Sequence, residues 1–187
     1  MSINREELIE KIRLNLVEID LNALMSTGFK LSSVLVIIHF TDSIPKTILT
    51  KRSSKLTYHS NEISFPGGSF HHEDYTLLNT ALRETKEEIG LDFTSNEIAG
   101  SLQAVKTLTS NYVIIPYITF QTKIYEPKIL SDEVSSILNI PIFELLDSLS
   151  NNFSYKNFSN SFLFKYGQEI IWGATARIIK QIRDSLY

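Results

Sequence analysis

The pattern of apolar and polar positions along the chain predicts a mixture of helices and strands. Residues 33–40 form a continuous β-branched run typical of a buried strand, and residues 47–53 open a second strand. Residues 75–89 repeat apolar side chains at helical spacing and precede Gly90, a common residue at the end of a helix. The tail 173–186 has the same helical spacing. Because strands and helices interleave, we expect an α/β fold with helices covering a mixed β-sheet.

Other segments carry weaker patterns. Residues 5–25 have apolar positions at roughly helical spacing, which predicts one or two short helices against the body of the protein. Residues 63–68 predict a short strand that ends in a turn. Residues 131–138 predict a short helix or loop, followed by a strand-like segment at 140–145. Residues 148–161, rich in Asn and Ser, predict an exposed loop.

Length, charge and cysteine content exclude several classes of protein. A chain of 187 residues can bury a substantial core, and we divide it into an N-terminal helical segment, 1–28, packed on one domain, 29–187. The net charge of -3 gives no broad positive field for nucleic acids or membranes. The absence of cysteine excludes disulfides, thiolate metal sites and cysteine nucleophiles. With no signal-peptide pattern and no membrane-spanning run, we expect a cytoplasmic protein.

Three carboxylates crowd the last turns of the central predicted helix. Glu84, Glu87 and Glu88 stand at i, i+3 and i+4, so they share one face and repel each other. The helix dipole also disfavours anions there, whereas a bound divalent cation would reverse both effects. Carboxylate oxygens suit Mg²⁺ or Mn²⁺. The alternative is a solvated acidic face, partly screened by Arg83 and Lys86.

A glycine turn precedes this helix. The glycines of Pro66-Gly67-Gly68 allow the backbone to approach an anion or to adopt positive φ values. An ordinary tight turn is the alternative for this feature alone, but its combination with the carboxylates and the Arg83-Glu84 pair favours a functional site. Arg52, upstream of the turn, is our candidate for binding a substrate phosphate, because arginine makes bidentate phosphate contacts. The alternative for Arg52 is a surface cation.

Residues 65–91, FPGGSFHHEDYTLLNTALRETKEEIGL, resemble the Nudix box, the signature of Nudix hydrolases. The matching pairs are Arg83-Glu84, Glu87-Glu88 and Gly90-Leu91. The interval from Gly68 to Arg83 is one residue longer than in the general box, and no Glu falls where the first acid belongs. Asp74 is the nearest acid to that position.

The longer interval from Gly68 to Arg83 resembles the spacing found in the coenzyme A diphosphatase branch of that family. Residues 48–68, ILTKRSSKLTYHSNEISFPGG, are similar to the upstream signature of the branch, and residues 171–179 are similar to the start of its C-terminal helix. Asn61 and His71 depart from the branch pattern, which usually has Gly and Asp there.

This resemblance implies a Nudix α/β/α sandwich and a Mg²⁺- or Mn²⁺-dependent hydrolase. The implied reaction cleaves the diphosphate of coenzyme A or acyl-CoA to adenosine 3',5'-bisphosphate and 4'-phosphopantetheine or its acylated form. The alternatives are another small-molecule substrate, such as ADP-ribose or NADH, and a catalytically silent nucleotide-binding module. A third alternative is an acidic interaction protein without a metal. No nucleic-acid or membrane partner is implied, and a homodimer is left open.

The resemblance also assigns roles to single residues. Glu84, Glu87 and Glu88 would ligate the metal, and Arg83 would pair with an acid and orient the helix. The proton of the attacking water would pass to Glu84, Glu87 or Glu133, with Glu133 read alternatively as an acid near a helix start. Arg52, Gly67 and Gly68 would contact the substrate, and Gly90 would end the helix.

Overall fold

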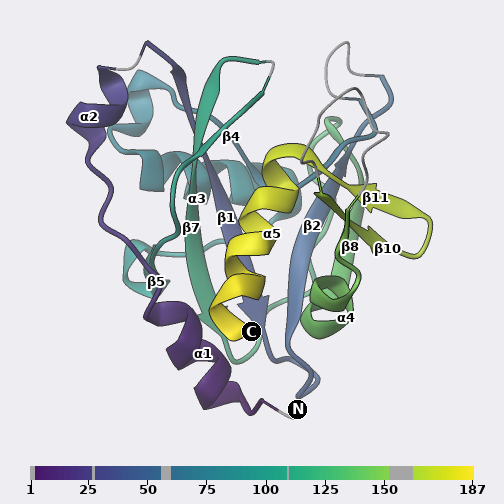
Figure 1. The fold of residues 1–187 in the computed structure, drawn as a ribbon. Helices are drawn as coiled ribbons and strands as arrows, with labels where there is room; N and C mark the ends of the chain where they lie inside the picture. The colour runs from purple at the N-terminus through teal and green to yellow at the C-terminus, as the bar shows by residue number, and fades with distance from the viewer. Residues whose placement is uncertain (1–2, 27, 56–59, 109, 152–161) are drawn as a thin grey trace.

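The structure is a computed structural model. It describes residues 3–26, 28–55, 60–108, 110–151 and 162–187 (Figure 1). His59, in the upstream signature, and most of the loop predicted at 148–161 lie outside these residues.

Helices and strands alternate along the described chain. The helices are α1 (Arg5–Arg13), α2 (Leu21–Met25), α3 (Leu77–Ile89), α4 (Ile142–Asp147) and α5 (Gly173–Leu186), with short 3-10 helices η1 (His72–Asp74) and η2 (Ser95–Glu97). The strands are β1 (Lys30–His39), β2 (Lys46–Arg52), β3 (Ile63–Ser64), β4 (Gly67–Ser69), β5 (Ile98–Ser101), β6 (Val105–Lys106), β7 (Tyr112–Gln121), β8 (Val134–Pro141), β9 (Ser150–Asn151), β10 (Phe162–Tyr166) and β11 (Glu169–Ile171).

The main sheet is mixed. Among the described residues it has eight strands: the order β3-β2-β1-β7-β5 forms its path, β4 pairs with β1, β6 pairs with β7, and β8 pairs with β2. Strands β1 and β7 run parallel along their whole length, and the other pairs are antiparallel. A second, smaller sheet contains β9, β10 and β11. The predicted α/β class with a mixed sheet is therefore confirmed.

Helices α3 and α5 cover opposite faces of the main sheet (Figure 1). Side chains alternate between the two faces of a strand, so Leu35 and Ile37 of β1 pack toward α3, and Val36 packs toward α5. Helix α1 adds the fully buried Leu8 and Ile12 to the core beside α5.

The division of the chain at residue 28 stays a prediction. None of the helices within the described ranges is long and apolar enough to cross a membrane.

The region after residue 130 differs from the sequence prediction. Residues 134–138 belong to β8, which pairs with β2, rather than to a helix or loop. Residues 142–147 form α4 rather than a strand, because Ile142, Leu145 and Leu146 are buried at helical spacing. The start of the loop predicted at 148–161 includes β9, which pairs with β10.

Residues 63–69 connect two diverging strands. Strand β2 pairs with β1 only at Ile38 and His39, near the end of β1. Farther along, β2 pairs instead with β3, while β4 pairs with residues 32–34 of β1. The segment thus passes from β2 to β1 within a few residues. The predicted turn is wrong for Gly67 and Gly68, which belong to β4 because they pair with β1. Residues 66–68, here called the glycine turn after that prediction, lie against β1 and beside α3.

Candidate active site

Helix α3 has well-defined ends that orient its carboxylates. The Thr76 hydroxyl accepts a 3.1 Å hydrogen bond from the Asn79 amide, a standard N-terminal cap. Gly90 has φ 71° and ends the helix in the left-handed conformation, as the sequence predicted. Ala81 and Ile89 are buried against the sheet. The helix is therefore fixed in rotation as well as in length.

The glycine turn and two of the predicted metal ligands meet closely. The Gly67 amide donates to Glu88 Oε2 at 3.3 Å. A Cβ at Gly68 would lie 2.5 Å from both Cδ and Oε1 of Glu84, so the Glu84 carboxylate occupies the space that a side chain would need. Gly67 has φ 150°, and a Cβ there would lie 2.3 Å from the Ser33 carbonyl oxygen. Gly68 is therefore required to leave room for the Glu84 carboxylate, whereas Gly67 is required by its φ and by the close approach of the β1 backbone.

The two carboxylates beside the turn are costly to ionise. Glu88 is 6% exposed, and burial raises its pKa to about 8. The nearby charge of Glu84 raises that pKa further, against the Gly67 amide, which lowers it. Burial also raises the pKa of Glu84, opposed mainly by Arg83. A buried acid beside a partly buried one is the environment that a bound cation would relieve.

Arg83 is held by Asp74. Its Nε donates to Asp74 Oδ1 at 2.6 Å and its Nη2 to Oδ2 at 3.0 Å, while Nη1 lies 2.9 Å from carboxylate oxygens of both Glu84 and Glu87. The Arg83 guanidinium, with the Thr80 hydroxyl, holds the pKa of the buried Asp74 well below its usual range. The resemblance implied an acid partner for Arg83. In the structure that partner is Asp74, placed by η1 within the longer interval.

Arg52 and Glu133 form an ion pair. Arg52 Nη2 lies 3.1 Å from Glu133 Oε2, and both side chains affect the pKa of Glu88, Arg52 lowering it and Glu133 raising it. Arg52 Nε is buried and has no hydrogen-bond partner among the described residues. The structure thus brings together two residues that the sequence analysis selected from separate segments, and it places both near Glu88.

Residues 128–133, here called the strap, cross the C-terminal end of α3. The Lys128 amide donates to the Ile89 carbonyl at 2.9 Å, and the Leu130 amide donates to the Glu88 carbonyl at 3.0 Å. The last carbonyls of a helix have no hydrogen-bond partner within the helix, and the strap supplies amide donors to two of them in α3. The strap continues to Glu133, whose carbonyl accepts from the Ser53 amide at 2.7 Å. Sequence analysis missed it because an irregular segment has no periodicity.

The donor groups fit a hard divalent cation. Within the described ranges, no three acidic or histidine side chains are already arranged around a common point that could hold an ion. Glu84 and Glu87 contact Arg83, and Glu88 contacts the Gly67 amide. The donors are nevertheless oxygens only, from one buried and one partly buried carboxylate besides Glu87, which is the chemistry that Mg²⁺ and Mn²⁺ prefer. Glu87 is the most accessible, with 57% of its side chain exposed.

Comparison with known proteins decides the family. The profile of the NUDIX domain matches residues 30–160. The chain belongs to the Nudix family. It is therefore a pyrophosphohydrolase, as relatives that carry the name Nudix hydrolase support. Nudix hydrolases generally use divalent metal ions, typically Mg²⁺ or Mn²⁺.

Relatives of this Nudix hydrolase come from distant organisms. A Photorhabdus laumondii protein named uncharacterized Nudix hydrolase NudL is 31% identical over 148 residues, covering 76% of this chain and 78% of that protein. Nudix hydrolase 3 of Caenorhabditis elegans is 38% identical over 117 residues, covering 61% of this chain and 48% of that protein.

Solved structures support the Nudix fold. A MutT/nudix family protein from Enterococcus faecalis has a TM-score of 0.58 at 14% identity, covering 97% of this chain and 73% of that one. The NUDIX domain of Shewanella oneidensis NrtR, solved in complex with ADP ribose, has a TM-score of 0.61 at 18% identity and full coverage of both chains. At these identities the likeness shows the fold alone.

Proposed function

We propose that this Nudix hydrolase cleaves the diphosphate bond of coenzyme A or acyl-CoA. The products would be adenosine 3',5'-bisphosphate and 4'-phosphopantetheine or its acylated form. The observation that carries the proposal is the upstream signature at 48–68, together with the one-residue-longer interval between Gly68 and Arg83. The place of Arg52 supports it, because the charge of this member of the signature acts on Glu88 and lowers the pKa of that carboxyl.

The metal and the glycine turn would act on the diphosphate together. Glu84, Glu87 and Glu88 would hold the ion, and Arg83, fixed by Asp74, would position the helix that carries them. When bound, Mg²⁺ or Mn²⁺ supplies charge stabilisation to phosphoryl oxygens and lowers the pKa of a coordinated water. Gly67 and Gly68 would contact the substrate through their backbone, while the space that their side chains would need is already filled by β1 and by the Glu84 carboxylate.

Arg52 and Glu133 would change partners when substrate binds. A phosphate oxygen is a strong acceptor for the Arg52 guanidinium, whose Nε has no partner among the described residues. Transfer of Arg52 to the phosphate would release the Glu133 carboxylate, which could then accept a proton from the attacking water. The water oxygen would bond to phosphorus, and the bridging P–O bond would break toward the leaving phosphate. The Glu133 carboxylate would thus be free to act as the base only when substrate is bound.

Another nucleoside diphosphate derivative, ADP-ribose above all, is the second candidate substrate. The NUDIX domain of NrtR, which shares the fold at a TM-score of 0.61, was solved with ADP ribose. Asn61 and His71, where the sequence departs from the coenzyme A branch, leave room for a different substrate.

Hydrolysis of three substrates side by side tests the proposal. The chain is incubated with Mg²⁺ or Mn²⁺ and coenzyme A, 3'-dephospho-coenzyme A or ADP-ribose, and the products are separated by chromatography. We expect selective release of adenosine 3',5'-bisphosphate from coenzyme A. Preference for ADP-ribose would keep the Nudix chemistry and overturn the coenzyme A assignment.

A variant of Glu87 tests the metal site. Because the Glu87 side chain is mostly exposed, Glu87→Gln is expected to keep the fold and thermal stability while turnover falls by about 100-fold or more. The exposed Glu18, on a segment far from α3 in the sequence, provides the matched control Glu18→Gln, which should keep full activity. Unchanged turnover in Glu87→Gln would remove Glu87 from the mechanism.

A further inference from the structure

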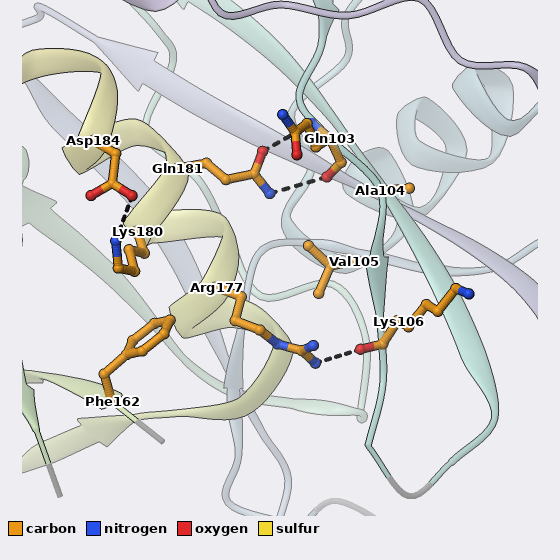
Figure 2. Close-up of a pocket in the computed structure, with 9 residues that line it drawn as sticks. All are labelled: Gln103, Ala104, Val105, Lys106, Phe162, Arg177, Lys180, Gln181 and Asp184. Carbon is orange, nitrogen blue, oxygen red and sulfur yellow. Dashed lines mark hydrogen bonds and ion pairs between the residues drawn. The ribbon is translucent and has the colours of Figure 1, made fainter. Parts of the chain in front are cut away.

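A cavity of about 270 Å³ lies between α5, β6 and β10 (Figure 2). It opens on the α5 side of the sheet, where Val105 joins the core, whereas the carboxylate helix α3 lies on the opposite side. Along the sheet, β4 and β6 are separated by β1 and β7, which is three strand spacings or about 14 Å. The cavity is therefore separate from the glycine turn, and Phe162, Arg177 and Lys180 lie beyond the match to the NUDIX profile.

Arg177 places a half-buried cation in this cavity without a carboxylate partner. Its Nη2 donates to the Lys106 carbonyl and its Nε to the Gly173 carbonyl, and no ion pair joins it to any acid of the described chain. The guanidinium is partly removed from water, and this burial lowers its pKa. Buried charges in proteins are usually paired, so this guanidinium has capacity for an external anion.

The charge of the lining also favours an anion. Three cationic residues and one acid, Asp184, line the cavity, which is a positive surplus in a chain of net charge -3. Lys180 Nζ contacts Asp184 and lies 5.9 Å from the centre of the Phe162 ring. Lys106 points away from the cavity in Figure 2, with its ammonium over the Phe29 ring. Arg177 and Lys180 would therefore make the direct contacts, and Lys106 would add only long-range attraction.

The walls around these cations are held in place. Phe162 packs edge-on against the fully buried Phe164, with ring centres 6.4 Å apart. On the other side, Gln181 accepts from the Gln103 amide at 2.9 Å and donates to the Gln103 carbonyl at 3.1 Å. Figure 2 shows Arg177 between these two walls. A cavity with fixed walls loses little conformational entropy when a ligand enters.

We propose that this cavity binds a small phosphate ester. The phosphate group would contact Arg177 and Lys180, because the planar guanidinium matches phosphate oxygens and a phosphate monoester carries nearly two negative charges. The organic part would lie against Phe162 and Val105. A volume of about 270 Å³ lies just below the usual range for small-molecule sites, which suits a ligand of modest size. The site does not depend on the identity of the diphosphate substrate.

Calorimetric titration of the full chain without divalent metal tests the site. The probes are adenosine 5'-monophosphate, ribose 5-phosphate, inorganic phosphate and adenosine. None contains a diphosphate bond, so the enzyme cannot cleave them. We expect both esters to bind more tightly than inorganic phosphate, and adenosine not to bind measurably. Absence of ester binding, equal binding of inorganic phosphate, or equal binding of adenosine would overturn the proposal.

Variants locate the binding. Arg177→Gln should weaken ester binding about tenfold or more, the loss expected for a charge-assisted hydrogen bond. Lys180→Gln, at a second position of the lining, should weaken it severalfold. The matched control Arg183→Gln, also in α5 but beside Tyr187, should bind as the parent does. If Arg177→Gln binds normally, or if Arg52→Gln loses binding, the esters occupy the diphosphate site and the proposal is wrong.

Discussion

Substitution of Gly68 by alanine should separate activity from stability. A Cβ at Gly68 would lie 2.5 Å from the Glu84 carboxylate, whereas ordinary contact begins near 3.4 Å. The carboxylate must therefore move by about 1 Å, a misplacement that can cost about 100-fold in rate. The clash involves only the far end of a flexible side chain, and alanine also restricts the unfolded chain, so the free energy of unfolding should change by less than about 1 kcal/mol.

Gly67→Ala provides the contrast. There the Cβ would meet backbone, at 2.3 Å from the Ser33 carbonyl oxygen and 2.6 Å from the Val34 Cα, and φ is 150°. Neither neighbour can rotate away, so we expect a loss of about 3 kcal/mol or more in unfolding free energy. Thermal unfolding and turnover with Mg²⁺ are measured on both variants. Full activity of Gly68→Ala, with its fold intact, would refute the role given to the Glu84 position.

Two further predictions concern Asp74 and Glu88. Asp74→Asn weakens the hydrogen bonds to Arg83 and should lower the unfolding free energy by about 2 kcal/mol in urea denaturation. The exposed Asp184→Asn should change it by less than about 0.5 kcal/mol, and an equal loss in both would contradict this account. Glu88 has a pKa of about 8 in the folded chain, against an ordinary value of 4.5. Between these pH values the unfolded state has lost the Glu88 proton and the folded state keeps it. The unfolding free energy of the metal-free protein should therefore fall as the pH rises through this range. Glu88→Gln should remove most of this pH dependence of stability, and Mg²⁺ should raise the melting temperature more at pH 8 than at pH 6. If the pH dependence is the same in Glu88→Gln, another group causes it.

The part of the site that is local in sequence could be predicted. Helical spacing placed Glu84 and Glu88 on one face, and the sequence combined them with the glycine turn before the helix as one candidate site. The end of α3 at Gly90 is confirmed, while its start at Leu77 is two residues later than predicted because Thr76 is the N-terminal cap. These features depend on the backbone geometry of neighbouring residues, which the sequence pattern reports directly.

The contacts between distant segments could not be predicted. Arg52 and Glu133 are 81 positions apart, and their contact depends on the pairing of β2 with β8. Residues 131–138 show neither a helical nor an alternating pattern, since β8 has only partial burial along much of its length. Charged Arg177 looks like an ordinary exposed residue of a C-terminal helix until β6 is placed beside it. Tertiary pairing decided each of these positions.

Residues 63–69, which connect β2 to β1, limit where residues can be inserted or deleted during evolution. Ile63 and Ser64 are hydrogen-bonded to one strand, and Gly67 to Ser69 are hydrogen-bonded to another, with only two residues between. One inserted or deleted residue there would shift the register of β4 on β1 and turn the Gly67 amide away from Glu88. Insertions in exposed loops carry no such penalty. Homologous chains should therefore vary in loop length elsewhere while keeping this interval constant.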